Sequence, residues 1–246
     1  MKCVILCAGY GTRLYPLTKF IAKPLLPING KSVINHIIEK VDELKEVDEI
    51  FITTNKEFHG QFNEWKEAYK DSFKQKITLF KNTYFFKKKK MGGVDAISRI
   101  VKKYKIKDDF LVIGGDNLFD FSLESSYNFF RKRKSTIILL HKLKDRKKAS
   151  SFGVVQTKNG VVVDFQEKPE KPNSNLISTA VYFFPRKDLD SITHYNNSQH
   201  KGDSFGHFLK FLYQKEKVYG FVTKGKFMDI GNLDDYKRAG EVLKNE

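Results

Sequence analysis

Near its amino end the chain reads Lys2-Cys3-Val4-Ile5-Leu6-Cys7, and then, after Ala8, Gly9-Tyr10-Gly11-Thr12-Arg13-Leu14. An apolar run of this length that ends at glycine is typical of a buried strand. Glycines let backbone N–H groups close around an anion without Cβ clashes. Because Arg13 adds a planar fork of donors and Lys23 a point charge, the turn predicts a polyphosphate site. The competing interpretation is an ordinary turn from a strand into a loop.

Beyond this turn, strand-like and helix-like patterns alternate through the first half of the chain. Strands are predicted over 2–7, 49–54, 77–80 and 110–113, and helices from Ser32 and over 58–69 and 93–104. This β-α-β order predicts an α/β fold with a mostly parallel, doubly wound sheet flanked by helices. Ligands of such sheets bind at the carboxyl ends of strands.

After Ser135 the pattern changes to strands. They are predicted over 136–141, 152–157, 161–166, 177–184 and 218–223, with helices over 205–215 and 233–243. Asn159-Gly160 is a strong signal for a two-residue hairpin turn, so a small antiparallel hairpin region is expected here. Because we find no repeat or low-complexity linker, we expect a single domain over residues 1–246.

Composition narrows the class of protein. The chain has 246 residues, 40% of them apolar, which is enough to bury a substantial core. It contains no uncharged apolar run of 18 residues, and the first apolar run is too short for a signal peptide. We therefore expect a cytoplasmic protein without a membrane partner. Cys3 and Cys7 lie about 13 Å apart on one strand, beyond disulfide reach, and are expected to be reduced core residues.

The chain is strongly basic, with a formal charge of +16 and a run of four lysines from Lys87 to Lys90. This charge favours anionic ligands and leaves a nucleic-acid binder as one alternative. The tetralysine lacks the interleaved aromatic residues of single-strand binders, so we interpret it as a solvated loop near the site. Nucleic acid is therefore not the expected partner, and salt-sensitive retention of DNA or RNA would test this.

Two aspartates are candidate metal ligands. Asp116 follows the strand 110–113 and two glycines, and Asp229 lies in Phe227-Met228-Asp229-Ile230-Gly231. Two carboxylates together with substrate phosphates are a usual arrangement around Mg²⁺. Taken singly, each aspartate is more often a cap or turn residue. Beside a phosphate loop, the pair predicts a magnesium site.

A third group of candidates lies in the hairpin region. Glu167 can accept hydrogen bonds from sugar hydroxyls, and Lys168 can hold a second phosphate. Gly153, on the partner strand, would let a flat ligand lie against the backbone. The competing interpretation of Glu167-Lys168-Pro169 is a solvated strand end.

Several standard motifs are excluded. The pattern G-x-G-x-x-G fails because Leu14 occupies the third glycine position, and no Walker phosphate loop occurs. The six histidines form no metal-ligand spacing, and no nucleophile elbow is present. These exclusions suit a reaction that needs no protein nucleophile.

Taken together and in this order, the motifs G-x-G-T-R-L, Lys-Pro-Leu-Leu-Pro, Gly-Gly-Asp, Phe-Gly-Val, Glu-Lys-Pro and Asp-x-Gly resemble those of the sugar-1-phosphate nucleotidyltransferases. The likeness runs from Met1 to about Tyr236. It implies a Rossmann-like nucleotidyltransferase fold of the GT-A-like type and transfer of a nucleotide from a nucleoside triphosphate to a sugar 1-phosphate, with Mg²⁺.

The resemblance also implies residue roles. Arg13 and Lys23 would be the catalytic cations. The nucleoside triphosphate would be lined by Leu6, Ala8, Gly9, Gly11, Thr12 and Arg13. The metal would be held by Asp116 and Asp229, and the sugar phosphate by Gly153, Glu167 and Lys168.

The chain departs from the family pattern at three places. Tyr10 stands where small residues are frequent, and Asn232 stands where threonine is usual. The segment 85–93 lacks the glutamine that would read the base in thymidylyltransferases. The sequence therefore leaves the base open, as well as the oligomeric state.

The leading hypothesis is an enzyme that makes an NDP-hexose from dTTP or UTP and glucose 1-phosphate. One alternative keeps the fold with another substrate pair, either mannose 1-phosphate with GTP or phosphocholine with CTP. Another is a regulatory subunit that binds sugar nucleotides without turnover. Such a subunit would tend to lose one of Arg13, Lys23 and the two carboxylates, and all four are present.

Overall fold

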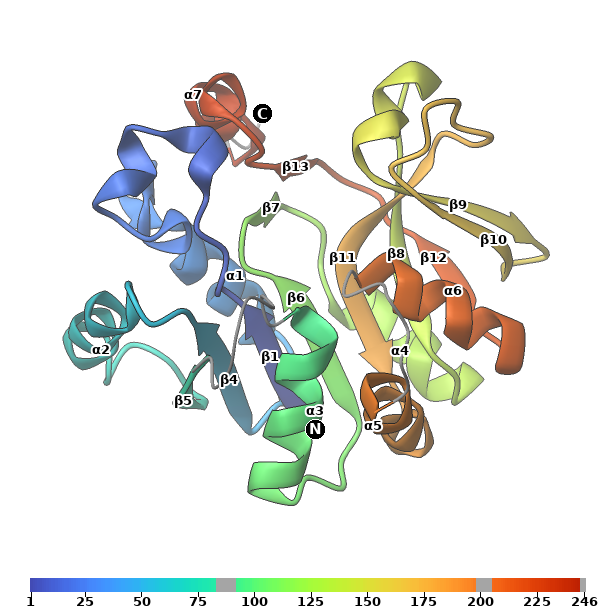
Figure 1. The fold of residues 1–246 in the computed structure, drawn as a ribbon, viewed down its shortest axis with the longest axis horizontal. Coiled ribbons are helices and arrows are strands. Elements are labelled where there is room, and N and C mark those ends of the chain that lie inside the picture. The colour runs from blue at the N-terminus through green and yellow to red at the C-terminus, as the bar shows by residue number, and fades with distance from the viewer. Residues whose placement is uncertain (83–91, 198–204, 244–246) are drawn as a thin grey trace. The chain divides into compact units, whose positions relative to one another are not determined.

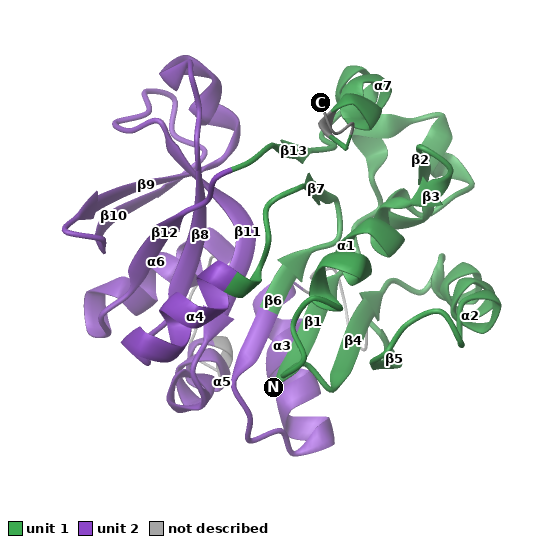
Figure 2. Ribbon diagram, turned by 180° about the vertical axis from the view of Figure 1, so that it is seen from behind, with its two compact units in different colours: residues 1–85, 112–124, 225–246 green, residues 86–111, 125–224 purple. Residues whose placement is uncertain are grey.

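The computed structural model describes residues 1–82, 92–197 and 205–243 (Figure 1). They gather into two compact units, coloured separately in Figure 2. Unit 1 comprises Met1–Phe85, Val112–Glu124 and Gly225–Glu246, and unit 2 comprises Phe86–Leu111 and Ser125–Lys224. This division does not test whether the chain forms the single domain expected over residues 1–246, which stays a prediction.

Unit 1 is built on parallel strands. Its strand order is β5-β4-β1-β6, with β1 at Lys2–Leu6, β4 at Glu49–Thr54, β5 at Lys76–Lys81 and β6 at Phe110–Gly114, of which the last three residues belong to this unit. β1 pairs in parallel with β4, and β4 with β5. Val4 and Ile5 are fully buried, as expected for parallel strands covered on both faces. Each such side chain stabilises the fold by about 1.5–3 kcal/mol.

The helices of unit 1 are α1 (Val33–Val41), α2 (His59–Ala68) and α7 (Leu233–Val242). α1 buries Val33, Ile34, Ile37, Ile38 and Val41, which recur at helical spacing. In α2 the buried anchors are Phe62 and Trp65. Unit 1 also contains the short hairpin β2–β3 (Pro27–Ile28 and Lys31–Ser32) and three short 3₁₀ turns at Thr12–Leu14, Leu17–Lys19 and Lys23–Leu25.

A second small ladder in unit 1 joins distant parts of the chain. β7 (Asn117–Phe119) pairs antiparallel with β13 (Phe227–Asp229), so that Asp229 lies opposite Asn117. Strands of three residues are too short to show alternation in the sequence, and neither was predicted. The ladder places the chain after β6 beside the chain that leads into α7.

Unit 2 has the strand order β11-β8-β12-β10-β9. The strands are β8 (Ile137–Lys142), β9 (Gly153–Lys158), β10 (Val161–Glu167), β11 (Leu176–Phe184) and β12 (Tyr219–Val222). β12 and β8 are parallel, whereas β11–β8, β10–β9 and β10–β12 are antiparallel. The predicted hairpin turn is confirmed: both Asn159 (φ 53°) and Gly160 (φ 76°) have the positive φ of a type I′ turn.

The helices of unit 2 are α3 (Gly93–Tyr104), α4 (Glu124–Arg133, apart from its first residue), α5 (Leu189–Asn197) and α6 (Phe205–Lys215), with 3₁₀ turns at Arg146–Ser151 and Arg186–Asp188. α3 packs against α5, and α6 packs on β10. α4 and α5 were not predicted, because serine, asparagine and charged residues dilute their apolar spacing.

The predicted α/β class, with a mixed sheet flanked by helices and a small hairpin region, is confirmed. Cys3 and Cys7 are both buried and free, as expected. Among the described residues, we find no helix with the length and apolar character needed to cross a bilayer.

Candidate functional site

The glycine turn begins where β1 ends. Gly11 has φ 62°, a left-handed conformation that side chains other than glycine adopt at a cost. A Cβ at this position would lie 3.1 Å from Thr18 Cγ2 and 3.3 Å from Lys23 Cβ. The Thr18 hydroxyl donates a 2.7 Å hydrogen bond to the Gly11 carbonyl. The turn is therefore folded onto the segment that carries Lys23.

β4 supports the turn from its other side. The Cys7 amide donates to Thr53 Oγ1 at 3.1 Å. The Asn55 side chain, 2% exposed, donates to the carbonyls of Ala8 and Gly9 at 3.4 and 3.5 Å, and its Oδ1 accepts from the Phe58 amide at 2.8 Å. Asn55 was not among the predicted site residues. Its place after the carboxyl end of β4 is the signal that could have identified it.

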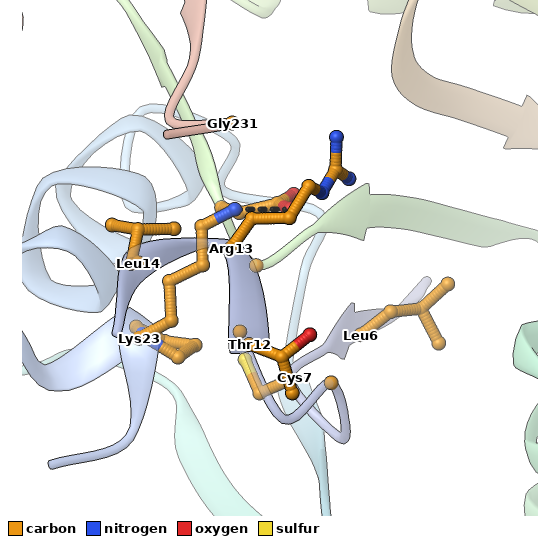
Figure 3. A pocket seen from close by; sticks show the side chains of 12 residues that line it. Leu6, Cys7, Thr12, Arg13, Leu14, Lys23 and Gly231 are labelled. Atoms are coloured by element: carbon orange, nitrogen blue, oxygen red, sulfur yellow. Dashed lines mark hydrogen bonds and ion pairs between the residues drawn. The ribbon is translucent and has the colours of Figure 1, made fainter. Parts of the chain in front are cut away.

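A pocket of about 220 Å³ opens at this turn (Figure 3). It is lined by Leu6, Cys7, Gly9, Gly11, Thr12, Arg13, Leu14, Lys23, Pro24, Gly115, Asp116 and Gly231. All but one of the predicted nucleotide-binding residues line it, and Ala8, the exception, is adjacent in the turn. Ligand-binding pockets typically measure about 300–1,000 Å³, so this pocket lies just below that range.

Lys23 lies between the two predicted metal ligands. Its Nζ is 2.8 Å from Asp116 Oδ2 and 3.8 Å from Asp229 Oδ1, and Figure 3 marks the first contact with a dashed line. Lys23 is 8% exposed, so its ammonium is largely withdrawn from water. Two carboxylates that share one ammonium must lie on the same side of unit 1. The predicted convergence of Asp116 and Asp229 is therefore observed.

The backbone explains this convergence. The Ile230 amide donates to the Asp116 carbonyl at 3.1 Å, which extends the β7–β13 ladder by one bond. The Gly115 amide donates to the Leu6 carbonyl at 3.0 Å, and a Cβ on Gly115 would collide with Cys7 Sγ. Glycine at 115 thus lets the end of β6 approach β1 closely enough to bring Asp116 to the turn.

The electrostatics of Asp229 are unusual for an aspartate. Its pKa is raised to about 6, first because the carboxyl is buried and then because of the negative charge on Asp116. Lys23 and Arg13 act in the opposite direction and favour the charged form. Asp229 Oδ1 is buried and has no hydrogen-bond partner among the described residues. This oxygen is available to a further cation.

These features fit a divalent cation. Mg²⁺ is typically held by one or two carboxylates, with substrate phosphates and water completing its octahedron. The described part of the chain contains no group of three or more His, Cys, Asp or Glu residues that would enclose a metal by itself. Asp116 and Asp229 therefore suit an ion that arrives with a phosphorylated ligand, and Asp229 Oδ1, which has no hydrogen-bond partner among the described residues, provides a ligand for it.

The remaining predicted residues, Gly153, Glu167 and Lys168, lie in unit 2 at the paired ends of β9 and β10. Lys168 is exposed, has φ 47°, and donates its amide to the Phe152 carbonyl at 3.0 Å. The Phe165 ring fills the space over Gly153, with Cζ 2.5 Å from where a Cβ would be. This close packing alone explains why residue 153 is glycine. The role of Gly153 in binding a ligand stays a prediction.

Glu167 is half-buried against α6. Its Oε2 occupies the space that a Cβ on Gly206 would need. Its charge also raises the pKa of Tyr182, although burial of that phenol is the larger cause. Glycine at the start of α6 thus allows the carboxylate to lie against the helix.

Asn232 resolves one departure from the family pattern. It is the N-cap of α7, where its side chain accepts a 2.9 Å hydrogen bond from the Asp235 amide. Asparagine and threonine both perform this function, so the change from the usual threonine preserves the start of the helix. The other notable departure, between Phe85 and Met91, lies outside the described residues, as do Lys87 to Lys90.

Comparison with known proteins adds independent information. A family model described as "Nucleotidyl transferase" matches residues 2–246. The chain is 35% identical to Bifunctional protein GlmU of Methanocaldococcus jannaschii, over 99% of this chain and 54% of that protein. It is 30% identical to a UTP--glucose-1-phosphate uridylyltransferase of Synechocystis sp., over 97% of this chain and 62% of that protein. The chain thus spans little more than half the length of these relatives.

Among solved structures, the fold is similar to that of a Bacillus anthracis protein described as a glucose-1-phosphate thymidylyltransferase. The two share a TM-score of 0.86 at 24% identity, over 100% of this chain and 96% of the other. At this level of identity the likeness concerns the fold.

Proposed function

Because the chain belongs to the nucleotidyl transferase family, we propose that it transfers a nucleoside monophosphate from a nucleoside triphosphate to a sugar 1-phosphate. The products are an NDP-sugar and pyrophosphate. The observation that carries the proposal is the placement of Lys23, 2.8 Å from Asp116 and 3.8 Å from Asp229, in a pocket that also contains the glycine turn and Arg13. This arrangement provides cations for a phosphate chain and carboxylates for a metal.

In this proposal the triphosphate lies along the glycine turn. Backbone N–H groups between Gly9 and Thr12 donate to its oxygens, and Arg13 binds the β and γ phosphates through its planar fork. Lys23 neutralises the charge that develops between the transferred and the leaving phosphates. Its ammonium therefore exchanges part of its carboxylate contact for phosphate oxygens when the ligand binds.

The chemistry needs positioning more than proton transfer. An oxygen of the sugar phosphate, already ionised, forms a bond to the α-phosphorus, while the bond from that phosphorus to the β-phosphate oxygen breaks. The electron pair of the broken bond leaves with pyrophosphate. Because nucleophile and leaving group are both anions, cancellation of charge and in-line alignment account for the catalysis.

Asp116 and Asp229 are the residues that would hold Mg²⁺. The ion, when bound, supplies electrostatic stabilisation of the phosphate oxygens. The support for this assignment is the buried oxygen of Asp229 that has no hydrogen-bond partner among the described residues, together with the raised pKa of this carboxyl, which burial and then the charge of Asp116 produce.

For the acceptor, we propose that Glu167 binds hydroxyls of the sugar, that Lys168 binds its phosphate, and that Gly153 lies beside it. Glucose 1-phosphate with UTP or dTTP is the favoured substrate pair. The Synechocystis relative is named for UTP and glucose 1-phosphate, which supports this choice. The pairs of mannose 1-phosphate with GTP and phosphocholine with CTP are the alternatives.

The test is a grid of nucleoside triphosphates against sugar 1-phosphates in the presence of Mg²⁺, with pyrophosphate release as the readout. We expect release for at least one pair and its loss in Asp116→Asn. Asp71→Asn, at an exposed turn of the same unit, is the matched control and retains activity. Binding of the nucleotide without release by any pair would favour the regulatory subunit and overturn the enzymatic proposal.

A further inference from the structure

The segment from Tyr15 to Ile21 joins the two proposed phosphate-binding cations, Arg13 and Lys23, and is largely exposed. Phe20 is 72% exposed and Ile21 43%, so this segment has little apolar burial of its own to fix its shape. At its middle it is held by the hydrogen bond from the Thr18 hydroxyl to the Gly11 carbonyl. What holds its carboxyl end is a side chain of α2.

That side chain is Gln61. Its Oε1 accepts a hydrogen bond from the Ala22 amide at 2.9 Å, and its Nε2 donates to the Phe20 carbonyl at 2.7 Å. Because one partner is a donor and the other an acceptor, only this orientation of the amide satisfies both. A single side chain therefore fixes the backbone on both sides of Ile21.

These two hydrogen bonds of Gln61, which we call the Gln61 clamp, hold the backbone immediately before Lys23. Ala22 is 1% exposed, is the N-cap of the 3₁₀ turn Lys23–Leu25, and accepts the Leu25 amide at 2.8 Å. Holding the Ala22 amide therefore fixes where the Lys23 side chain starts, while Asp116 fixes where its ammonium ends. Both of these Gln61 hydrogen bonds go to backbone atoms, so Gln61 acts on the charged groups of the pocket through the position of Lys23.

We propose that Gln61 is a positioning residue for Lys23, which sets the point from which the ammonium reaches the phosphate chain. The inference rests on the proposed function, since it assumes that Lys23 binds phosphate. It predicts that loss of the Gln61 amide weakens the interaction of Lys23 with polyphosphate. The helix itself is anchored elsewhere, by Phe62 and Trp65.

The experiment compares Gln61→Met with Asn63→Met. Methionine keeps the unbranched shape of glutamine without its hydrogen bonds, and Asn63 is an exposed amide on the same helix. The first readout is hydrogen exchange at the Ala22 amide, which reports the clamp without any ligand. The second is the affinity for inorganic tripolyphosphate at about 0.15 M salt, which is independent of the base and limits screening artefacts.

A double-mutant cycle with Lys23→Met separates positioning from general stability. We expect Gln61→Met to accelerate exchange at Ala22 and to weaken tripolyphosphate binding by about three- to tenfold, the range of one or two neutral hydrogen bonds. In the Lys23→Met background, the same change should alter affinity less than about twofold. Asn63→Met should leave both readouts unchanged.

Two results would overturn the inference alone: equal losses of affinity in both Lys23 backgrounds, or unchanged affinity in Gln61→Met despite faster exchange at Ala22. Failure of the unmodified protein to bind tripolyphosphate would instead overturn the phosphate site, and the inference with it. If Gln61→Met lowers the thermal midpoint, Gln61→Glu replaces it. Glu keeps the acceptor for the Ala22 amide but sets a carboxylate oxygen against the Phe20 carbonyl, so faster exchange at Ala22 and a loss of tripolyphosphate affinity at least as large as in Gln61→Met are expected.

Discussion

The pocket of unit 1 and the end of β10 in unit 2 both present a lysine and acidic groups, but they hold them differently. Lys23 is buried and its ammonium is held by Asp116 and Asp229. Lys168 is exposed, and the Glu167 carboxylate lies against the backbone at Gly206. Charges that are fixed before a ligand arrives suit chemistry, whereas an exposed lysine suits recognition of the acceptor. Mutations in the two regions should therefore have different kinetic signatures.

The largest effect is expected for Lys23→Met. The change removes one of the two cations of the pocket and leaves Arg13 as the remaining positive charge that acts on the Asp229 carboxylate. We expect kcat to fall about a thousandfold, the scale of one lost electrostatic partner of a transition state. Pyrophosphate release on the best substrate pair measures it, with Lys19→Met, an exposed lysine of the same unit, as control. Activity within tenfold of the unmodified protein would remove Lys23 from the chemical step.

Lys168→Met should produce the other signature. Losing a charged hydrogen bond to the acceptor phosphate should raise the KM for the sugar 1-phosphate about ten- to hundredfold. The KM for the nucleoside triphosphate should stay unchanged, and kcat should change little. Lys171→Met, also exposed, is the matched control. A rise in the KM of the triphosphate instead would mean that Lys168 binds the nucleotide, and would contradict the assignment of the two regions to different substrates.

Gly206→Ala tests how Glu167 is held. Its new methyl group would occupy the position of Glu167 Oε2 and lie 2.9 Å from Phe165 Cε1. Overpacking of this kind costs about 1–3 kcal/mol of unfolding free energy. Gly60→Ala is the matched control, because Gly60 lies near the start of α2 and, apart from its chain neighbours and the nearby backbone of its own helix, no described atom lies within 4 Å of where its Cβ would be. That control should gain about 0.5–1 kcal/mol from helix propensity, as denaturant titration would show. Equal unfolding free energies of the two variants would mean that the Glu167 side chain moves away from residue 206 without a cost in stability.

The smallest effect concerns the ligand-free stability of unit 1. The pKa of Asp229 is raised from its ordinary value of 3.8 to about 6, so the folded protein binds this proton more tightly than the unfolded chain. Stability from this group is therefore complete below pH 4 and is lost as pH rises through 6. Asp229→Asn cannot titrate, and its thermal midpoint relative to the unmodified protein should rise between pH 4 and 7.

Asp71→Asn, at an exposed site, should show no such pH-dependent difference. A variant that is less stable than the unmodified protein at pH 7 would indicate that the contact with Lys23 outweighs the burial of the Asp229 carboxyl.

The sequence was most informative where one residue type serves one physical purpose. Long apolar runs such as β1 and the periodic apolar face of α1 predict buried elements, and Asn159-Gly160 predicts a hairpin turn. Asp116 and Asp229 could be paired because both follow strands, at the edge where ligands bind. Their shared contact with Lys23 agrees with that placement.

The sequence did not predict contacts between a side chain and a backbone segment that is distant along the chain. Gln61 belongs to a helix whose pattern marks only Phe62 and Trp65, and nothing near it in the sequence indicates Phe20 or Ala22 as partners. β7 and β13 are similarly hidden, because three-residue strands show no periodicity. Features of this kind depend on tertiary contacts, which local patterns do not encode.

The side chain of Asn232 carries a consequence for the interchangeability of residues at the start of α7. Since its function is to accept the Asp235 amide, Ser, Thr or Asp at this position should be equivalent, and Ala should fray the first turn. Fraying would begin three residues from Asp229. Position 232 should therefore tolerate several amino acids, provided that the side chain can accept one hydrogen bond.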